Sequence, residues 1–428
     1  MRLLLLAQFF PPDIGGEELH VFNLANTLAD RGHDVAVATQ QLGDTPDKEV
    51  LSSGVRVHRF ETTAMRLPGL YSTGRPHHPP IPDPLGVREL RRIVRLERPD
   101  VVHAHNWIVN SAVALRRRRS AGDSPFGLVL TLHDYSQVCA TKRFMREGAP
   151  CAGPAPLRCL SCATAHYGAI AGPVTAVATA AMRPWKTAAV DHVVSVSRAV
   201  ALGNRIPSGP GSSVIPNFVP DATILSSLAD QADRPAPGSA CAIPDGDFLL
   251  YVGDLSVDKG VTVLLRAYEA LGPGRPPLIM IGRRTADTPA KLPSGAKLHV
   301  DWPHEHVLAA FRRCTVAVLP SIWPDPCPTT VLEAMASGRP VITTSIGGMI
   351  DMIDDGTSGL LVPPGSVGEL AVAIDRLLAD SQERARLGAG ALQKVRGFTV
   401  TAVAGQLEVV YGKVASGQQR PQRPRPAS

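Results

Sequence analysis

Five residues in the second half of the chain have types and spacing suited to holding a phosphorylated ligand. Asp325 and Glu333 lie eight positions apart around a proline-rich loop. A carboxylate can accept two hydrogen bonds, so Glu333 suits the two hydroxyls of a ribose. The backbone N–H groups near Thr329 and Thr330 suit phosphate oxygens. Lys259, in an earlier turn, can neutralise phosphate as a mobile point charge.

The pattern of apolar residues predicts which elements carry these side chains. Residues 315–320 and 341–344 are typical of buried strands, and residues 331–337 between them can form a short helix. Lys259 lies in a turn between another predicted strand and helix. In open α/β sheets, ligands bind beyond the carboxyl ends of the strands. The alternative interpretation is an ordinary turn followed by a solvated helix surface.

Gly15 and Gly16 indicate a second anion-binding turn near the N-terminus. They follow a predicted strand at residues 3–10 and precede an amphipathic helix at residues 17–31. Glycines let a ligand approach the backbone closely, and a helix N-terminus favours an anion. Neither a GxGxxG sequence nor a Walker A sequence occurs, so a dinucleotide site is disfavoured. An ordinary strand-to-helix turn is the alternative.

His133 is a candidate for a functional side chain in the N-terminal half, and a strand-end histidine in an ordinary turn is the alternative. It directly follows a strand predicted at residues 128–132, so its imidazole should lie at the ligand-binding edge of a sheet. His77 and His78 are predicted to lie in a plain surface loop. The four-arginine run at 116–119 is predicted to be a solvated face, with a phospholipid contact as the alternative.

The segment DPCPTTVLEAMASGRPVI, which starts at Asp325, resembles the nucleotide-sugar motif of retaining GT-B glycosyltransferases of the GT4-like, or group 1, family. Members carry an acid, seven residues, a Glu and an Ala-Met-Ala-x-Gly-x-Pro-Val segment. The resemblance implies an α/β fold with two Rossmann-like domains facing across a cleft. It also implies transfer of a sugar from a UDP- or GDP-linked donor to a hydroxyl acceptor, with retention of configuration and without a catalytic metal.

The resemblance also implies roles for single residues. Glu333 would bind the ribose, and Asp325 would contact the donor sugar. The Gly15–Gly16 loop would face the donor diphosphate, and His133 would lie beside the reacting face of the sugar. The expected catalytic residues are His133, Lys259 and Asp325, and the expected donor-binding residues are Gly15, Gly16, Lys259, Asp325, Thr329, Thr330 and Glu333.

Two positions depart from the family pattern. Asp325 stands where Glu is usual, so its side chain is shorter by one methylene. Asp254 stands where an Arg usually contacts the diphosphate, and Arg283 or Arg284 is expected to substitute for it. These departures keep open a non-catalytic binding or scaffold protein with a degenerate donor site. A nucleotide-sugar epimerase on the same fold is a further alternative.

Four cysteines, Cys139, Cys151, Cys159 and Cys162, form a C-x11-C-x7-C-x2-C array after His133. Only the last pair has a spacing common in zinc sites. A short insert with few core residues needs a staple, and four thiolates around a structural zinc ion would provide one. Such a closed site would leave no position open for catalysis. Free thiols and a redox pair remain as alternatives.

The composition bounds the class of protein. The 428 residues are 44% apolar and 19% charged, which is a globular composition large enough for two domains. A net charge of +6 fits small anionic ligands or a membrane surface, and nucleic acid is not expected. The N-terminus lacks a cleavage signal and no apolar stretch reaches about 20 residues, which predicts a cytoplasmic protein. Peripheral contact with the inner face of a membrane is an additional possibility, and the acceptor could be a glycan, a lipid-linked molecule or a small molecule.

The expected domain organisation follows from these patterns. An N-terminal, acceptor-side domain is predicted at 1–218 with a Cys-rich insert at 139–162, followed by a linker at 219–245. The nucleotide-sugar domain is predicted at 246–398. A helix at 399–415 would cross back to the N-terminal domain, and 416–428 would be a disordered tail. Further helices are predicted at 87–97, 173–189, 261–271, 306–313, 369–378 and 382–388.

Overall fold

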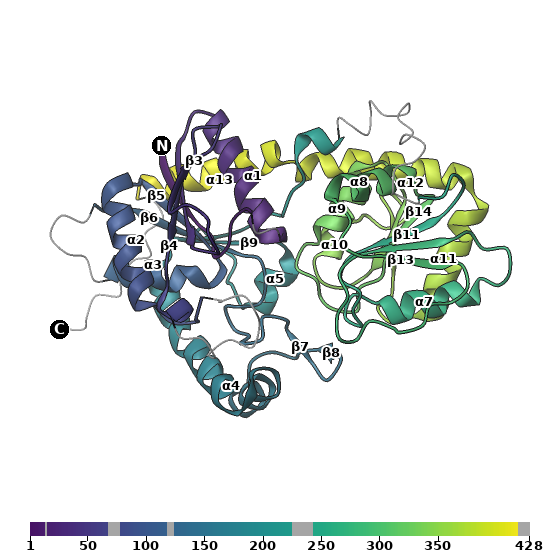
Figure 1. The fold of residues 1–428 in the computed structure, drawn as a ribbon, viewed down its shortest axis with the longest axis horizontal. Helices are drawn as coiled ribbons and strands as arrows, with labels where there is room; N and C mark the ends of the chain where they lie inside the picture. The colour runs from purple at the N-terminus through teal and green to yellow at the C-terminus, as the bar shows by residue number, and fades with distance from the viewer. Residues whose placement is uncertain (13–14, 67–77, 118–123, 225–242, 418–428) are drawn as a thin grey trace. The chain divides into compact units, whose positions relative to one another are not determined.

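The computed structural model describes residues 1–12, 15–66, 78–117, 124–224 and 243–417 (Figure 1). The chain divides into two compact units. Unit 1 comprises Met1–Arg146, Cys151–Pro216 and Val403–Ser428, and unit 2 comprises Glu147–Pro150 and Asn217–Ala402. Most of the predicted linker and of the predicted tail, residues 225–242 and 418–428, lie outside the described residues.

Unit 1 is built on an eight-stranded sheet with the order β10-β9-β6-β5-β1-β2-β4-β3. Its neighbouring strands are parallel except for β3 and β4. The central strands are almost wholly buried, as expected where helices cover both faces of a parallel sheet. The strands are β1 (Arg2–Leu6), β2 (Asp34–Gln40), β3 (Lys48–Val50), β4 (Arg56–Phe60), β5 (Val101–His105), β6 (Gly127–Leu132), β9 (His192–Ser195) and β10 (Ser212–Val214).

Helices cover the two faces of this sheet. The connections β1–β2 and β4–β5 run in opposite directions along the strand order, so right-handed crossovers put their helices on opposite faces. The residue that ends α1, Arg31, pairs with Glu408 of α13 at 2.6 Å, so α1 and α13 share a face. The helices of unit 1 are α1 (Gly16–Asp30), α2 (Pro84–Glu97), α3 (Val109–Arg117), α4 (Pro156–Ala189), α5 (Arg198–Gly203) and most of α13 (Val400–Ala415), with 3-10 turns η1 (Thr63–Arg66) and η2 (Asn106–Ile108).

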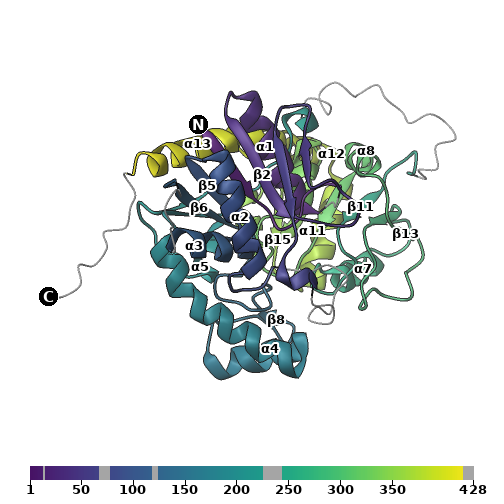
Figure 2. The same cartoon turned by 60° about the vertical axis from the view of Figure 1, so that its left-hand side comes forward.

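Helix α4 differs from the prediction, because it begins 17 residues before the expected start at residue 173. It consists of two helical segments that meet at Gly168, where φ is 87°. A Cβ on Gly172 would lie 2.5 Å from the backbone of Thr164, so the second segment folds back onto the first. Figure 2 shows α4 extending below the sheet of unit 1. The short strands β7 (Met145–Arg146) and β8 (Ala149–Pro150) precede it.

Unit 2 contains a six-stranded parallel sheet with the order β13-β12-β11-β14-β15-β16. The chain moves outward from β11 to β13 and then returns to β14, so the strand order reverses between β11 and β14. The strands are β11 (Leu249–Val252), β12 (Leu278–Ile281), β13 (Ala296–His299), β14 (Val316–Leu319), β15 (Val341–Thr344) and β16 (Leu360–Val362). The helices are α7 (Val261–Ala270), α8 (His304–Arg313), α9 (Thr329–Ala336), α10 (Met349–Met352), α11 (Val367–Ala379), α12 (Ser381–Val395) and η3 (Arg396–Phe398).

Three other sequence-based expectations need correction. The strand predicted at residues 3–10 ends at Leu6, since the buried Phe9 and Phe10 belong to the following loop. His78 is buried against Ser111, at 2.9 Å, instead of lying on an exposed loop. Arg116 is not solvated, because it pairs with the buried Asp191 through two hydrogen bonds. No helix among the described residues is long and apolar enough to span a bilayer.

Candidate active site

Lys259 and Asp325 meet at the carboxyl edge of the unit 2 sheet. Lys259 lies in the loop after β11 and Asp325 in the loop after β14, where the strand order reverses. The Lys259 ammonium forms an ion pair with the Asp325 carboxylate and lies 4.9 Å from the centre of the Trp323 ring. Asp325 is buried, whereas about a quarter of the Lys259 side chain is exposed. The carboxylate therefore anchors a cation that can still reach a ligand at the topological switch point.

Main-chain contacts join the two loops. The Asp258 carbonyl accepts hydrogen bonds from the N–H groups of Ile322, at 2.9 Å, and Trp323, at 3.0 Å. Gly260 has a φ of 78°, and a Cβ there would lie 1.8 Å from the Pro320 carbonyl oxygen. The backbones thus approach so closely that only glycine fits at this position.

The Gly347–Gly348 turn packs against the backbone of the Asp325 loop. The Gly348 N–H donates to the Asp325 carbonyl at 2.7 Å. A Cβ on Gly348 would lie 2.0 Å from the Pro326 carbonyl oxygen. These contacts fix the main chain at Asp325 and so limit where its side chain can lie.

Helix α9 supplies the second carboxylate and a helix N-terminus. Pro328 is its N-cap residue, and no side chain caps the helix. Thr329 and Thr330 occupy its first turn. Without a side-chain cap, the first N–H groups of a helix remain available to an anion. Glu333, one turn further along, pairs with His304 of α8 at 2.9 Å. This hydrogen bond raises the pKa of His304.

His304 was missed in the sequence, because nothing in its neighbourhood marks it as a partner of Glu333. It lies at the start of α8, 29 positions before the carboxylate. Only the packing of α8 beside α9 brings the two side chains together. In this structure His304 therefore pairs with the carboxylate that was predicted to bind a ribose.

The side chains of Asp254 and Arg283 also meet. Asp254 is the departure from the family pattern, and Arg283 was expected to substitute for the arginine that is usual there. The guanidinium of Arg283 bonds to both carboxylate oxygens of Asp254, at 3.0 and 3.3 Å. Both side chains are solvent-exposed. Arg283 thus neutralises the charge of Asp254. The guanidinium that was expected to contact the diphosphate is already paired with this carboxylate.

His133 lies at the carboxyl edge of the unit 1 sheet, directly after β6. Its N–H donates to the Asn106 side chain at 3.0 Å, and its Nε2 lies 2.8 Å from Nδ1 of His105. The His20 ring packs edge-on against His133, with centroids 4.7 Å apart. Burial lowers the pKa of His20 and of His105 well below the usual value, so both are neutral at physiological pH.

The imidazoles of His20, His105 and His133 are also spaced as metal ligands would be. Their nearest ring nitrogens lie within 4.8 Å of one another. However, the His105–His133 hydrogen bond uses one nitrogen of each ring and by itself explains why these two rings are close. The Nε2 of His105 is buried without a hydrogen-bond partner among the described residues, so this bond does not account for every nitrogen of the group.

Glu17 connects the predicted glycine loop with His133. Gly15 is the N-cap of α1, and Glu17 follows in its first turn. The Glu17 carboxyl accepts a hydrogen bond from Asn106 at 2.7 Å, and Asn106 in turn bonds the His133 backbone. Burial, followed by the charge of Glu18, raises the pKa of Glu17 to about 8. This carboxyl can therefore carry a proton at neutral pH, which the sequence pattern did not indicate.

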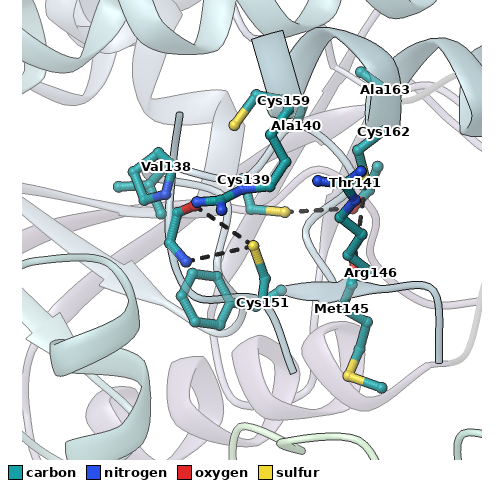
Figure 3. A pocket seen from close by; sticks show the side chains of 14 residues that line it. Val138, Cys139, Ala140, Thr141, Met145, Arg146, Cys151, Cys159, Cys162 and Ala163 are labelled. Atoms are coloured by element: carbon teal, nitrogen blue, oxygen red, sulfur yellow. Dashed lines mark hydrogen bonds between the residues drawn. The ribbon is translucent and has the colours of Figure 1, made fainter. Parts of the chain in front are cut away.

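The predicted site residues thus fall into three groups. Lys259, Asp325, Thr329, Thr330 and Glu333 all lie on the loops and helix at the switch point of unit 2. Gly15, Gly16 and His133 lie in unit 1, at the carboxyl ends of β1 and β6. The four predicted metal-ligating cysteines line a separate small cavity of unit 1 (Figure 3).

Two α/β units, one with paired carboxylates, a lysine and an uncapped helix at its switch point, are typical of enzymes that handle nucleotides. Comparison with known families agrees with this class. The model for "Glycosyl transferases group 1" matches residues 242–394, and the model for "Glycosyltransferase Family 4" matches residues 14–222. The chain belongs to this family of glycosyltransferases, which transfer a sugar from a nucleotide-sugar donor to a hydroxyl acceptor.

Individual relatives and solved structures confirm the predicted family and GT-B fold. The chain is 28% identical to glycogen synthase of Mycobacterium tuberculosis over 99% of this chain and 97% of that protein. It is 26% identical to D-inositol 3-phosphate glycosyltransferase of Xylanimonas cellulosilytica, over 96% and 94%. Its fold is similar to that of sucrose-phosphate synthase from Thermosynechococcus elongatus, with a TM-score of 0.69, 21% identity and coverage of 97% and 99%. Anabaena HepE in complex with UDP gives a TM-score of 0.64, 18% identity and coverage of 96% and 100%.

Proposed function

We propose that unit 2 binds the nucleotide sugar at the switch point between β11 and β14. The observation that carries this proposal is the Lys259–Asp325 ion pair beside the uncapped N-terminus of α9. Lys259 and the first N–H groups of α9 stabilise the charge of the diphosphate. Asp325 contacts hydroxyls of the donor sugar. The Glu333 carboxylate releases His304 and accepts hydrogen bonds from the ribose hydroxyls.

The same groups give the site its catalytic role. As the glycosidic bond breaks, negative charge grows on the departing diphosphate, and preorganised donors lower the barrier by stabilising it. Losing one such donor costs about 3 kcal/mol, on the order of a hundredfold in rate. We infer from the family resemblance that configuration is retained and that the acceptor proton passes to the departing phosphate. His133 contributes beside the reacting face of the sugar.

The donor and acceptor classes are narrowed by the relatives. A structural neighbour was solved with UDP, which favours a UDP-linked hexose over the GDP-linked alternative. The names of the relatives point to a glycan or an inositol phosphate as acceptors. We therefore propose a UDP-hexose donor and a hydroxyl acceptor on a glycan, a lipid-linked glycan or a small polyol.

The decisive experiment measures donor binding and acceptor-free hydrolysis for UDP-, GDP- and ADP-sugars. Calorimetry should give one preferred donor for the wild-type chain. Lys259→Ala and Glu333→Ala should each weaken its binding about tenfold to a hundredfold, the loss of one charge-assisted contact. Lys394→Ala is the matched control, because Lys394 pairs with Asp354 at 2.9 Å on α12, away from the switch point.

The two alternative functions predict different results. A degenerate scaffold would bind no donor, or would bind one without any hydrolysis or transfer to the glycan and polyol acceptors. An epimerase would convert a UDP-N-acetylhexosamine into its epimer, which analysis of the sugar products would reveal. Equal effects of the three alanine substitutions would show that the donor binds elsewhere.

We also propose that the chain makes a peripheral membrane contact through the second segment of α4. Ile170, Val174, Val177 and Trp185 lie on one face of this helix, and each is between 48% and 84% exposed. Residues 148–190 contain no acidic side chain. An exposed apolar helix face without acids suits insertion at the boundary between lipid headgroups and acyl chains.

Vesicle co-sedimentation tests this contact. The wild-type chain should sediment with phosphatidylglycerol vesicles, and the emission of Trp185 should shift to the blue. The double substitution Val174→Glu and Val177→Glu should abolish both effects. Val372→Glu, which changes a valine of unit 2 with 66% exposure, is the matched control and should still bind. Binding that survives in the double variant would refute the proposed contact.

A further inference from the structure

Four thiols of unit 1 surround one small cavity, which the proposed transferase function does not use. We call them the thiol quartet: Cys139, Cys151, Cys159 and Cys162. Two of them come from the segment between β6 and α4, and two come from the first turns of α4 (Figure 3). The cavity has a volume of about 30 Å³, enough for one or two water molecules or a single metal ion. Its other lining residues include Phe144 and Met145.

The segment that carries the quartet has little apolar packing of its own. One buried cluster of this segment consists of Ala140, Ala163 and Ala176, with Leu160 and Tyr167 packed beside them. Three alanines contribute little hydrophobic burial. A metal held by the four thiols would add stability to so small a cluster.

The backbone of this segment is also unusual. Lys142, Phe144 and Glu147 have φ values of 63°, 54° and 52°, in the left-handed region that non-glycine residues rarely adopt. Such residues persist only where their surroundings fix them. Here the Lys142 carbonyl accepts from the Tyr135 N–H at 3.2 Å and the Phe144 carbonyl accepts from the Cys151 N–H at 2.8 Å, so hydrogen bonds beside the quartet fix this backbone.

The sulfur atoms are set in surroundings that suit thiolates. The Gly153 N–H donates to the Cys151 sulfur at 3.4 Å, and the Ala155 N–H donates to the Cys159 sulfur at 3.4 Å. Hydrogen bonds from amides stabilise a charged acceptor. A divalent cation in the cavity would add a second attraction to sulfur atoms that already accept hydrogen bonds from amides.

We propose that the thiol quartet binds one Zn²⁺ ion in a closed tetrahedral site. Each thiol gives up its proton on binding, and Zn–S bonds of about 2.3 Å form. Among the described residues, no three of these sulfur atoms lie within 4.8 Å of one another. Zinc binding therefore requires the sulfur atoms to move closer together. Because four protein ligands leave no open position, the ion is structural.

The zinc site also bears on catalysis, and this step rests on the proposed role of His133. Cys139 lies six residues after His133, and its N–H donates to the Tyr135 carbonyl at 2.9 Å. Asn204 holds the Asp134 carbonyl at 2.8 Å. Zinc at Cys139 would thus fix the end of the segment that leaves His133. Loss of zinc should lower transfer activity while the binding of UDP by unit 2 is unchanged.

Metal analysis of the full chain tests the site. Protein purified from zinc-supplemented cells should contain roughly one zinc per chain, released by a thiol-directed mercurial. Cys159→Ser with Cys162→Ser should reduce the zinc content at least tenfold. Cys314→Ala is the matched control, because it removes a fully buried thiol of unit 2. Replacement of zinc by Co²⁺ should produce the charge-transfer absorption of cobalt–thiolate bonds, which a histidine site lacks.

Each contrary result refutes the proposal. Wild-type protein without zinc, or with the quartet in disulfides or bound to iron, would exclude a zinc site. Zinc that is retained in the double cysteine variant and lost in His105→Gln would place the ion among the histidines instead. If the double variant does not fold, the cobalt spectrum of the wild-type chain still decides, since it reports the ligand type directly. A confirmed zinc site with no donor binding would refute the proposed function alone.

Discussion

The Lys259 ammonium is held by the buried carboxylate of Asp325, from a loop 66 positions further along the chain. The contact spans the point where the strand order of the unit 2 sheet reverses. In the proposed donor site this lysine would serve two partners, because Asp325 already positions it for the diphosphate. The short side chain of Asp325, a departure from the family pattern, is thus already used in the structure without a ligand.

Substitution of Asp325 should separate binding of the nucleotide from binding of the sugar. Asp325→Asn removes the charge that holds Lys259 and one acceptor for sugar hydroxyls. We expect UDP to bind with nearly unchanged affinity, because Lys259 keeps its charge and loses a competing anion together with its anchor. The affinity for the UDP-sugar should fall about tenfold, which corresponds to the loss of one hydrogen bond to a charged group. Asp325→Glu is the control, and an equal loss for UDP and UDP-sugar would contradict the assigned contact.

Substitution of Asp254 should strengthen binding of the donor. In the wild-type chain Asp254 engages the Arg283 guanidinium and adds a negative charge near the diphosphate loop. Asp254→Asn should release Arg283 and tighten UDP binding severalfold at low salt, with a smaller gain at high salt. Arg283→Ala in the wild-type background should change UDP affinity little. If Arg283→Ala lowers UDP affinity as much as Lys259→Ala does, then Arg283 already contacts the diphosphate.

The His304–Glu333 pair should be visible in the titration of His304. The hydrogen bond that His304 donates to Glu333 raises the pKa of His304 in the free protein. In Glu333→Gln this pKa should fall toward about 6.5, the ordinary value for histidine. UDP should produce the same fall in the wild-type chain if ribose displaces His304. NMR of the imidazole protons measures both effects, and an unchanged His304 titration on UDP binding would exclude the displacement.

Tyr411 should contribute to the stability of unit 1 through a single hydrogen bond. His103 lies between the Tyr411 hydroxyl, at 2.7 Å, and the Thr131 hydroxyl, at 2.6 Å, and all three side chains are buried. Tyr411→Phe leaves a buried ring nitrogen unpaired and should cost about 1–3 kcal/mol in urea unfolding. Val409→Ala, an exposed position on the same helix, should cost much less. Equal effects would mean that the hydrogen bond is not formed.

Mild acid should destabilise the chain before its carboxylates titrate. Four buried histidines have pKa values below the ordinary value: His20, His78, His103 and His105. Their lowered pKa values keep these groups neutral in the folded state, with the pKa of His78 at about 4 and that of His103 at about 3. The unfolded chain binds their protons once the pH falls below about 6.5.

The sign of this effect follows from the protons that each state binds. Unfolding takes up protons at these histidines, so stability falls as pH falls from 6.5 toward 4.5. Glu17, with its raised pKa, opposes them, because it is already protonated in the folded state. The net loss should be on the order of 3 kcal/mol between pH 6.5 and 5.5. Urea unfolding at several pH values measures it, and His78→Asn should reduce the slope.

The fold and the arrangement of the candidate site in unit 2 could be predicted because both depend on local patterns. Short apolar runs separated by glycine and proline predict buried parallel strands, and the Asp325-to-Glu333 spacing marks one loop and one helix. His304 could not be found this way, since it reaches Glu333 only through the packing of α8 beside α9. Glu17 was missed for a similar reason, because its raised pKa comes from burial and neighbouring charge.

Other misses came from treating polar residues as solvated by default. His78 and Arg116 have partners, Ser111 and Asp191, that are 33 and 75 positions away in the chain. The early start of α4 was missed because Gly168 and Pro173 both predict an interruption. The structure accommodates them with a kink at Gly168, after which the helix resumes.

The glycine contacts of unit 2 separate the architecture of the donor site from its chemistry. Gly260 and Gly348 are pressed against the carbonyl oxygens of Pro320 and Pro326, so the loops are joined by atoms that every amino acid shares. Side chains that point into the site can therefore change without moving the loops that carry them. Such a site is free to diversify, and randomising Trp323 while keeping both glycines should yield folded variants with altered sugar preference.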